Sequence, residues 1–235
     1  MQIASRQPLW SEGVGKGTVL VVRTSDASMT VYVMGGSLAP GSAEAKISWG
    51  DGTTETVRNP QSLRHTYSAK KEYKIVISDD LSSFGFTDEY TDEKRQMLAE
   101  VLSVGRKVMS IPFAGFNNCR SMRGKIEFPS VTSIGTYAFG SLGGVTELSF
   151  PSLTRLTQTS FYAGCGPRTM YADNVTQIDS QFWEYYGSRL VDLYIRKKTC
   201  EQIKAMSGFP FRAGAAVRFH GSDGIVTGDG RITLG

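Results

Sequence analysis

Apolar residues recur at a fixed spacing in the second half of the chain. Val131, Ile134 and Phe139 follow the pattern V-x-x-I-x-x-x-x-F. The pattern occurs 23 residues earlier, 22 residues later and 22 residues after that. The other copies are Val108, Ile111 and Phe116; Leu153, Leu156 and Phe161; and Val175, Ile178 and Trp183. This nearly constant period predicts a stack of similar structural units with these residues in its interior.

A second pattern keeps the same period and alternates apolar with polar residues. The stretches that carry it, KIEFPS, ELSFPS, TMYADN and DLYIRK, begin at Lys125, Glu147, Thr169 and Asp192. Such alternation predicts a strand with one buried face. The expected buried positions are Ile126 and Phe128, Leu148 and Phe150, Met170 and Ala172, and Leu193 and Ile195. One strand per unit of about 22 residues is typical of a leucine-rich-repeat solenoid, in which parallel strands build one long sheet.

The first part of the chain has a different pattern. Short strand-like stretches separated by turns fill residues 17–77, for example TVLVVRT, SMTVYVMG and EYKIVIS. Their spacing predicts an antiparallel β-sandwich. Gly50-Asp51-Gly52 is expected to form a tight turn between two strands, with the Asp51 carboxylate accepting hydrogen bonds from local backbone amides. His65 and Tyr67 are expected to pack beside that turn.

A helix is predicted between the two parts. Thr87 or Asp88 can cap it, acidic residues follow in its first turn, and Gly105 ends it. Its apolar stripe at helical spacing consists of Met97, Leu98, Val101 and Leu102. We expect this helix to cover the first repeat and to form a stiff joint between two domains.

The repeats resemble a known family. FPSVTSIGTYAF and FNNCRSM are similar to the BspA-like leucine-rich repeats of bacterial surface proteins, whose units follow IPxSVTxIGxxAFxxCxSL. The resemblance covers about Val104–Phe219. The third copy lacks the Ile-Gly pair of the pattern, and the fourth has Ile178-Asp179 in its place.

The C-terminal stretch is expected to close the stack. KKTCEQIKAMSGF predicts a helix whose apolar residues are Cys200, Ile203 and Met206. The tail that follows predicts a capping strand or a hairpin, with the turn at Gly228-Asp229-Gly230.

The N-terminal part resembles a second family. WGDGTTETV followed by RHTYSAKKEYKIVI is similar to the polycystic kidney disease (PKD) type of immunoglobulin-like domain, although Glu72 stands where that family has glycine. Together the resemblances imply a mostly β protein, in which an immunoglobulin-like β-sandwich is joined by a capping helix to a short leucine-rich-repeat solenoid. The expected division is a leader at 1–14, a PKD-like sandwich at 15–80, a linker and capping helix at 81–104, and capped BspA-like repeats at 105–235.

Composition limits the class of protein. The 235 residues include 40% apolar residues, enough for a packed core, and the net charge is only +4. The basic residues are scattered, which favours a solvated surface over a nucleic-acid-binding one. No apolar run is long enough to cross a bilayer, and no signal peptide is visible. The sequence leaves open whether the protein stays in the cytoplasm, leaves by another route or has lost its natural N-terminus.

Candidate chemistry is sparse, and we expect no enzyme, no cofactor and no metal site. No CxxC pair suggests zinc, so Cys119, Cys165 and Cys200 are interpreted as small buried residues. His65 and His220 fall in predicted strands without a cysteine or aspartate at catalytic spacing, and are interpreted as structural.

The outward side of the predicted repeat sheet is the best candidate for a functional surface. Its outward residues should form a line of Glu127, Ser149, Tyr171 and Tyr194, with Arg196 beside the tyrosines. Tyrosine and arginine are enriched in binding hot spots, so the line is a candidate partner-binding site, with an ordinary solvated face as the alternative.

Two functions fit these features. The first is a non-catalytic adhesion protein, at the cell surface or secreted, that binds a protein or glycan of a host or neighbouring cell. The second is a structural component of a phage virion or a cell envelope, assembled in the cytoplasm.

Overall fold

The computed structural model of the chain describes residues 17–61, 63–86, 92–157, 160–161, 166–179, 182, 190–210 and 216–235. The protein is mostly β, with 40% strand and 5% helix, and parallel strands stack into a β-solenoid over residues 100–220. No helix in the described ranges is both long and apolar enough to cross a membrane.

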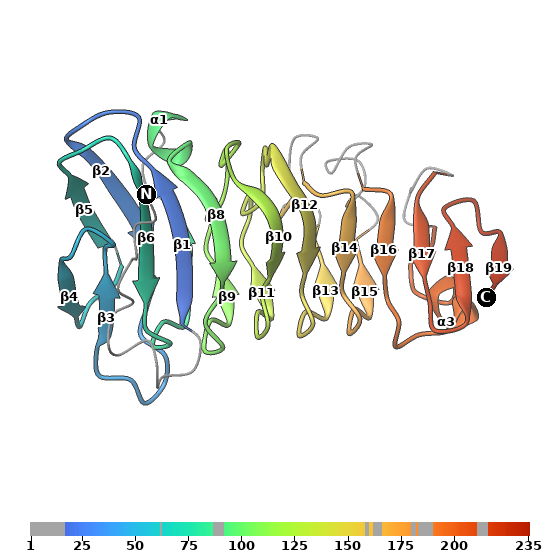
Figure 1. The fold of residues 1–235 in the computed structure, drawn as a ribbon. Helices are drawn as coiled ribbons and strands as arrows, with labels where there is room; N and C mark the ends of the chain where they lie inside the picture. Colours follow the sequence, from blue (N-terminus) through green and yellow to red (C-terminus); the bar gives the residue numbers. More distant parts are fainter. Residues whose placement is uncertain are drawn as a thin grey trace.

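One twelve-stranded sheet runs the length of the molecule (Figure 1). Neighbouring strands from β8 to β17 are parallel, as predicted for the repeats, and the strands at both ends are antiparallel. In order across the sheet, the strands are β19 (Ile232–Leu234), β18 (Gly224–Thr227), β17 (Arg218–His220), β16 (Asp192–Tyr194), β14 (Thr169–Tyr171), β12 (Gly144–Ser149), β10 (Arg123–Glu127), β8 (Leu98–Ser103), β1 (Thr18–Arg23), β6 (Glu72–Ile77), β3 (Ala45–Ser48) and β4 (Thr54–Val57).

Two short parallel pairs form the opposite side of the solenoid. They are β9 (Ser110–Ile111) with β11 (Ser133–Ile134), and β13 (Arg155–Leu156) with β15 (Gln177–Ile178). Between the two strands of each pair the chain makes one turn of the solenoid, through β10 in the first pair and β14 in the second, and Gly135 follows β11 directly. A Cβ atom on Gly135 would lie 2.6 Å from the backbone nitrogen of Phe113, so only glycine fits there.

The interior of the solenoid is built from stacked phenylalanines. Phe139 is fully buried and its ring stacks on Phe116 at 5.5 Å and on Phe161 at 5.3 Å. Phe128 and Phe150 stack at 5.1 Å in a second column. The predicted interior positions of the alternating strands are all buried. Trp183, the last aromatic of the repeat pattern, lies outside the described residues.

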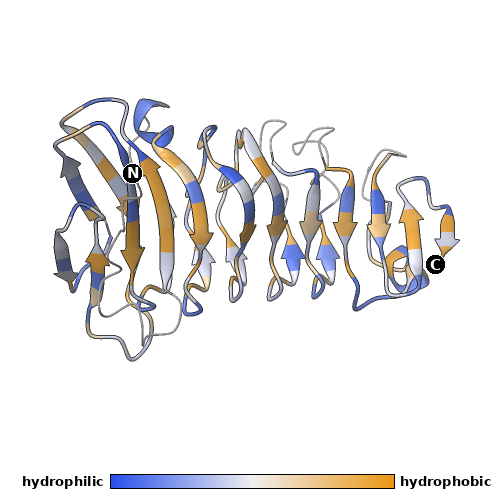
Figure 2. Ribbon diagram, viewed as in Figure 1, coloured by the Kyte–Doolittle hydropathy of each residue, from blue (hydrophilic) through white to orange (hydrophobic). Residues whose placement is uncertain are grey.

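The N-terminal part shares this sheet and this core. Strands β2 (Met29–Met34), β5 (Leu63–Tyr67) and β7 (Gly85–Phe86) form a separate three-stranded sheet. Most buried apolar residues of β1, β2, β3, β5 and β6 belong to the same hydrophobic cluster as the repeat phenylalanines. In Figure 2, orange hydrophobic segments recur along the row of strands from β1 to β18.

The prediction of a helix before the repeats is wrong for most of that segment. Helix α1 covers only Asp92–Arg95, and the next residues form β8, which pairs with β1 and β10. Two register shifts between β1 and β8 interrupt the alternation of buried and exposed residues. Leu98 and Val101 are therefore buried three positions apart, a spacing that mimics a helix, whereas Leu102 is 53% exposed. The predicted caps, Thr87 and Asp88, lie outside the described residues.

The predicted C-terminal cap is confirmed. Helix α3 (Cys200–Lys204) begins at Thr199, whose hydroxyl accepts a hydrogen bond from the Gln202 backbone while the Gln202 side chain bonds back to Thr199. Cys200, Ile203 and Met206 are buried, as expected. Strands β18 and β19 form a hairpin that turns through the Gly-Asp-Gly sequence.

Candidate binding face on the repeat sheet

The predicted line of outward residues exists as one cross-strand row. Glu127 lies opposite Ser149, Ser149 opposite Tyr171, and Tyr171 opposite Tyr194. The row continues to His220 on β17. The sequence pattern had not placed His220 in this row. We call the row from Glu127 to His220 the outer row.

Three neighbouring rings of the outer row stack on one another. The ring centroids of Tyr171 and Tyr194 are 4.6 Å apart, and those of Tyr194 and His220 are 4.1 Å apart. The interplanar angles are 20° and 12°. This spacing follows from the strand separation of about 4.8 Å, because identical positions on adjacent parallel strands bring their side chains into register. All three residues are partly exposed.

His220 has a carboxylate partner 28 residues away in the sequence. Its Nε2 donates a hydrogen bond of 2.6 Å to Asp192. Arg218 also binds Asp192 through two nitrogens, at 2.7 and 2.6 Å. Burial raises the pKa of Asp192, but the bonds from Arg218 and His220 outweigh it and hold that pKa below its usual value. Asp192 is thus an ionised anchor for both the arginine and the end of the ring stack.

Arg196 lies beside the tyrosines, as predicted. Its guanidinium binds Asp173 through Nε and Nη2, the latter at 2.6 Å, and lies 5.2 Å from the centre of the Tyr171 ring. Burial raises the pKa of Asp173, and the stronger effect of the Arg196 hydrogen bonds lowers it below its usual value. A guanidinium over an aromatic ring adds a cation–π attraction, so Arg196 helps to fix the ring it covers.

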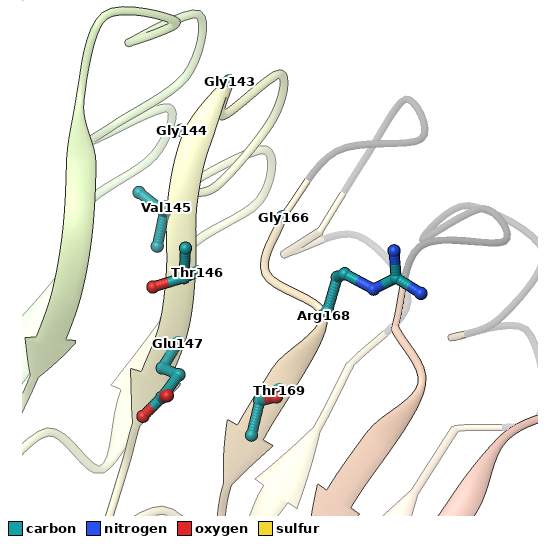
Figure 3. A pocket seen from close by; sticks show the side chains of 8 residues that line it. All are labelled: Gly143, Gly144, Val145, Thr146, Glu147, Gly166, Arg168 and Thr169. Carbon is teal, nitrogen blue, oxygen red and sulfur yellow. The ribbon is translucent and has the colours of Figure 1, made fainter.

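The other end of the face carries an ion pair and a groove. Lys125 Nζ lies 2.6 Å from the Glu147 carboxylate. Glu147 and Thr169 also line a groove of about 590 Å³ between the first residues of β12 and the chain leading into β14 (Figure 3). The remaining lining residues are Gly143, Gly144, Val145, Thr146, Gly166 and Arg168.

A second aspartate–histidine pair lies in the N-terminal part. His65 Nε2 donates a hydrogen bond of 2.7 Å to Asp51, and the His65 ring stacks on Trp49. The Asp51 carboxylate also accepts bonds from the Thr53 backbone amide and hydroxyl, as the predicted turn requires. Burial raises the pKa of Asp51, but the bonds from Thr53 and His65 lower it to about 2. The expectation that His65 packs beside this turn is therefore confirmed.

In the part of the chain that the structure describes, neither histidine is hydrogen-bonded to a nucleophile. The hydrogen bonds of His65 and His220 join each ring to an aspartate, and no serine, threonine or cysteine completes a catalytic set within the described ranges. Across the same ranges, no three histidine, cysteine, aspartate or glutamate side chains gather in a way that could hold a metal ion.

The described cysteines are not activated thiols. Cys119 and Cys200 are buried and free, as expected. Burial raises the pKa of the Cys119 thiol to about 12 and that of Cys200 to about 11. Cys165 lies outside the described residues.

Comparisons of the chain with models of protein families, with curated proteins and with solved structures found no match.

Proposed function

We propose that the chain is a non-catalytic binding protein that recognises a protein or glycan partner through the outer face of its repeat sheet. The observation that carries this proposal is the stack of Tyr171, Tyr194 and His220 on that face, with Arg196 over the first ring. Tyrosine and arginine, the residue types of Tyr171, Tyr194 and Arg196, are enriched in binding hot spots.

The stack is also ordered before any partner arrives. Each ring is held by its neighbours, and Asp192 and Asp173 fix the His220 and Arg196 side chains. Immobilising a flexible side chain on binding costs about 0.5–1.5 kcal/mol. A face whose side chains are already fixed avoids much of that cost, which distinguishes it from an ordinary solvated surface.

For the N-terminal part we propose a PKD-like, immunoglobulin-type sandwich. Support comes from the residues of the family pattern, which cluster around one turn. The Tyr67 hydroxyl donates a hydrogen bond of 2.7 Å to the Trp49 carbonyl, and both side chains are buried. With BspA-like repeats behind it, such a domain would serve as a spacer that presents the outer row at a cell surface or on a secreted protein.

The proposal is tested by binding the purified chain to an array of glycans and extracellular-matrix proteins. The Tyr171→Ala/Tyr194→Ala double variant is run beside the wild type, with circular dichroism to confirm its fold. We expect specific binding to at least one ligand and a loss of at least about tenfold in the variant. Equal binding by both proteins would refute the assignment of the outer row.

The alternative is a structural role in a virion or cell envelope. It is favoured by the two ends of the long sheet, because β4 and β19 each pair with a strand on one side only within the described residues. An open strand edge can add a strand from another chain. This role predicts that the protein sediments with particles or multimers, and a monomer absent from every particle fraction would exclude it.

A further inference from the structure

The ring stack stops abruptly at β12, although the row continues. The residue opposite Tyr171 on that strand is Ser149, whose side chain is too short to cover the ring. The next residue of the row is Glu127 on β10. Between the Tyr171 ring and β10 there is therefore one strand position without a ring. We call this position the Ser149 gap.

The Ser149 gap has the thickness of one further ring. Each strand of the stack adds one ring at 4.1–4.6 Å from the last. A flat ligand ring placed over Ser149 would continue the same series and meet the face of Tyr171 that looks toward β12. Aromatic faces prefer flat, apolar surfaces with weakly positive hydrogens, such as the C–H face of a sugar ring.

The groove of Figure 3 lies next to the gap, between the same two strands. Glu147 and Thr169 line the groove, and they lie two residues before Ser149 and Tyr171 on their strands. Residues two apart on a strand share a face and are separated by about 6.7 Å. The groove and the gap thus form one continuous strip. The volume of the groove, about 590 Å³, is within the range of small-molecule sites.

Polar groups with both donor and acceptor character border this strip. The pairing of β12 with β14 begins only at Glu147 and Thr169 in the described residues, so the edge of β12 from Gly144 to Thr146 faces the groove rather than a strand. The Glu147 carboxylate and the Lys125 ammonium lie together at its border. Vicinal hydroxyl groups, which donate and accept at once, suit such a mixture.

The charges that line the groove cancel, because its lining residues in the described part of the chain include one positive side chain, Arg168, and one negative side chain, Glu147. Around it lie Lys125, which is paired with Glu147, Arg123, which borders Gly144, and Glu127, which lies opposite Ser149. A groove lining without net charge offers no strong attraction to a sulfated or carboxylated ligand, and the Glu147 carboxylate would repel one locally.

We propose that the strip formed by the groove and the Ser149 gap binds a neutral glycan, with one sugar ring stacked on Tyr171 over Ser149 and the adjoining residues in the groove. This inference rests on the proposed function and narrows its partner to one chemical class. The stacked ring supplies the apolar contact, and Glu147 with the exposed strand edge binds hydroxyl groups.

The test measures binding of neutral tetrasaccharides of glucose, mannose and N-acetylglucosamine to the full chain. Each tetrasaccharide is added up to about 10 mM, and binding is measured by isothermal titration calorimetry. A heparin-derived tetrasaccharide serves as the anionic comparison. We expect at least one neutral tetrasaccharide to bind and the anionic one to bind at least about tenfold more weakly.

Three variants locate the site. Ser149→Tyr fills the gap with a ring and should abolish tetrasaccharide binding. The matched control is Ser133→Tyr, which adds the same ring at an exposed position of β11 on the opposite side of the solenoid and should leave binding unchanged. Tyr171→Ala removes the stacking ring and should weaken binding at least about tenfold, which keeps the test decisive if Ser149→Tyr fails to fold.

The outcomes separate this inference from the proposed function. Binding of proteins on the array without any tetrasaccharide binding would overturn the glycan site and leave the proposed function standing. Tetrasaccharide binding that survives Ser149→Tyr in a folded protein would overturn the position of the site. Tighter binding of the anionic tetrasaccharide would overturn the choice of a neutral ligand.

Discussion

At the scale of single residues, the repeat period places each interior side chain against the equivalent side chain of the next repeat. Phe139 is fully buried between Phe116 and Phe161, which occupy the same position in the flanking repeats. Interiors are close-packed, so a missing ring leaves a cavity that neighbours fill only partly. These interior positions could be predicted from the sequence because the same spacing of apolar residues recurs in each repeat.

Phe139→Ala should lower the free energy of unfolding by about 3–5 kcal/mol, since it removes a fully buried ring. Phe113→Ala is the matched control, because that phenylalanine is 51% exposed, and should cost about 1 kcal/mol or less. Urea denaturation measures both values. Equal losses for the two variants would contradict the assignment of Phe139 to the core.

The hydrogen bonds of the two aspartate–histidine pairs could not be predicted at this scale, although His65 was correctly expected beside the Asp51 turn. Asp192 and His220 are 28 residues apart, and their contact depends on the register of β16 against β17. The alternation in RFH, which matches that in DLY, was the available signal for placing His220 in the outer row. Asp51 and His65 likewise meet only after the turn and the strand pairing are formed.

Asp51→Asn should reduce stability at neutral pH and weaken its dependence on pH. The pKa of Asp51 is about 2 in the folded protein and about 3.9 in an unfolded chain, so the carboxylate stabilises the fold above pH 4. That contribution is lost as the pH falls from about 4 to about 2. We expect a loss of about 1–2 kcal/mol at pH 7, measured by urea denaturation, and a shallower acid transition. An unchanged acid transition would contradict this role.

At the scale of elements, β8 shows where pattern analysis reaches its limit. The sequence contains four apolar residues at helical spacing, yet the chain there completes the sheet between β1 and β10. The register shifts on the β1 side disturb the strand alternation, and only the neighbouring strands determine where such shifts occur. The repeat strands, by contrast, keep a regular alternation and were predicted correctly.

Val101→Lys and Leu102→Lys distinguish the strand from the predicted helix. In β8, Val101 is buried and Leu102 is exposed, whereas the helical stripe would bury both. We expect Val101→Lys to cost more than about 3 kcal/mol, because it buries an unpaired charge, and Leu102→Lys to stay within about 0.5 kcal/mol. Thermal unfolding of the two variants measures this contrast. Similar large losses in both would favour the helix.

At the scale of the whole molecule, one sheet and one core connect the N-terminal part to the repeats. Strand β8 hydrogen-bonds to β1 on one side and to β10 on the other. Trp49 in the N-terminal part and Phe139 in the repeats belong to the same hydrophobic cluster. This continuity predicts that the two parts unfold together, although their sequences suggest separate domains.

Unfolding of a Trp10→Phe/Trp183→Phe variant tests this continuity, since its fluorescence reports on Trp49 alone. Circular dichroism, to which the strands of both parts contribute, is recorded in the same urea titration. We expect coincident transitions for the two signals. Two separated midpoints would show that the parts are independent.

Binding of three proteins to one array of glycans and matrix proteins most directly tests whether the repeat sheet is the binding face. They are the wild type, the Tyr171→Ala/Tyr194→Ala variant of the outer row, and the Phe113→Ala/Tyr137→Ala variant, which removes two exposed rings from another surface. We predict that the Tyr171→Ala/Tyr194→Ala variant loses binding and that the Phe113→Ala/Tyr137→Ala variant retains it. Equal binding by all three, or loss in the third alone, would contradict the claim that the repeat sheet is the binding face.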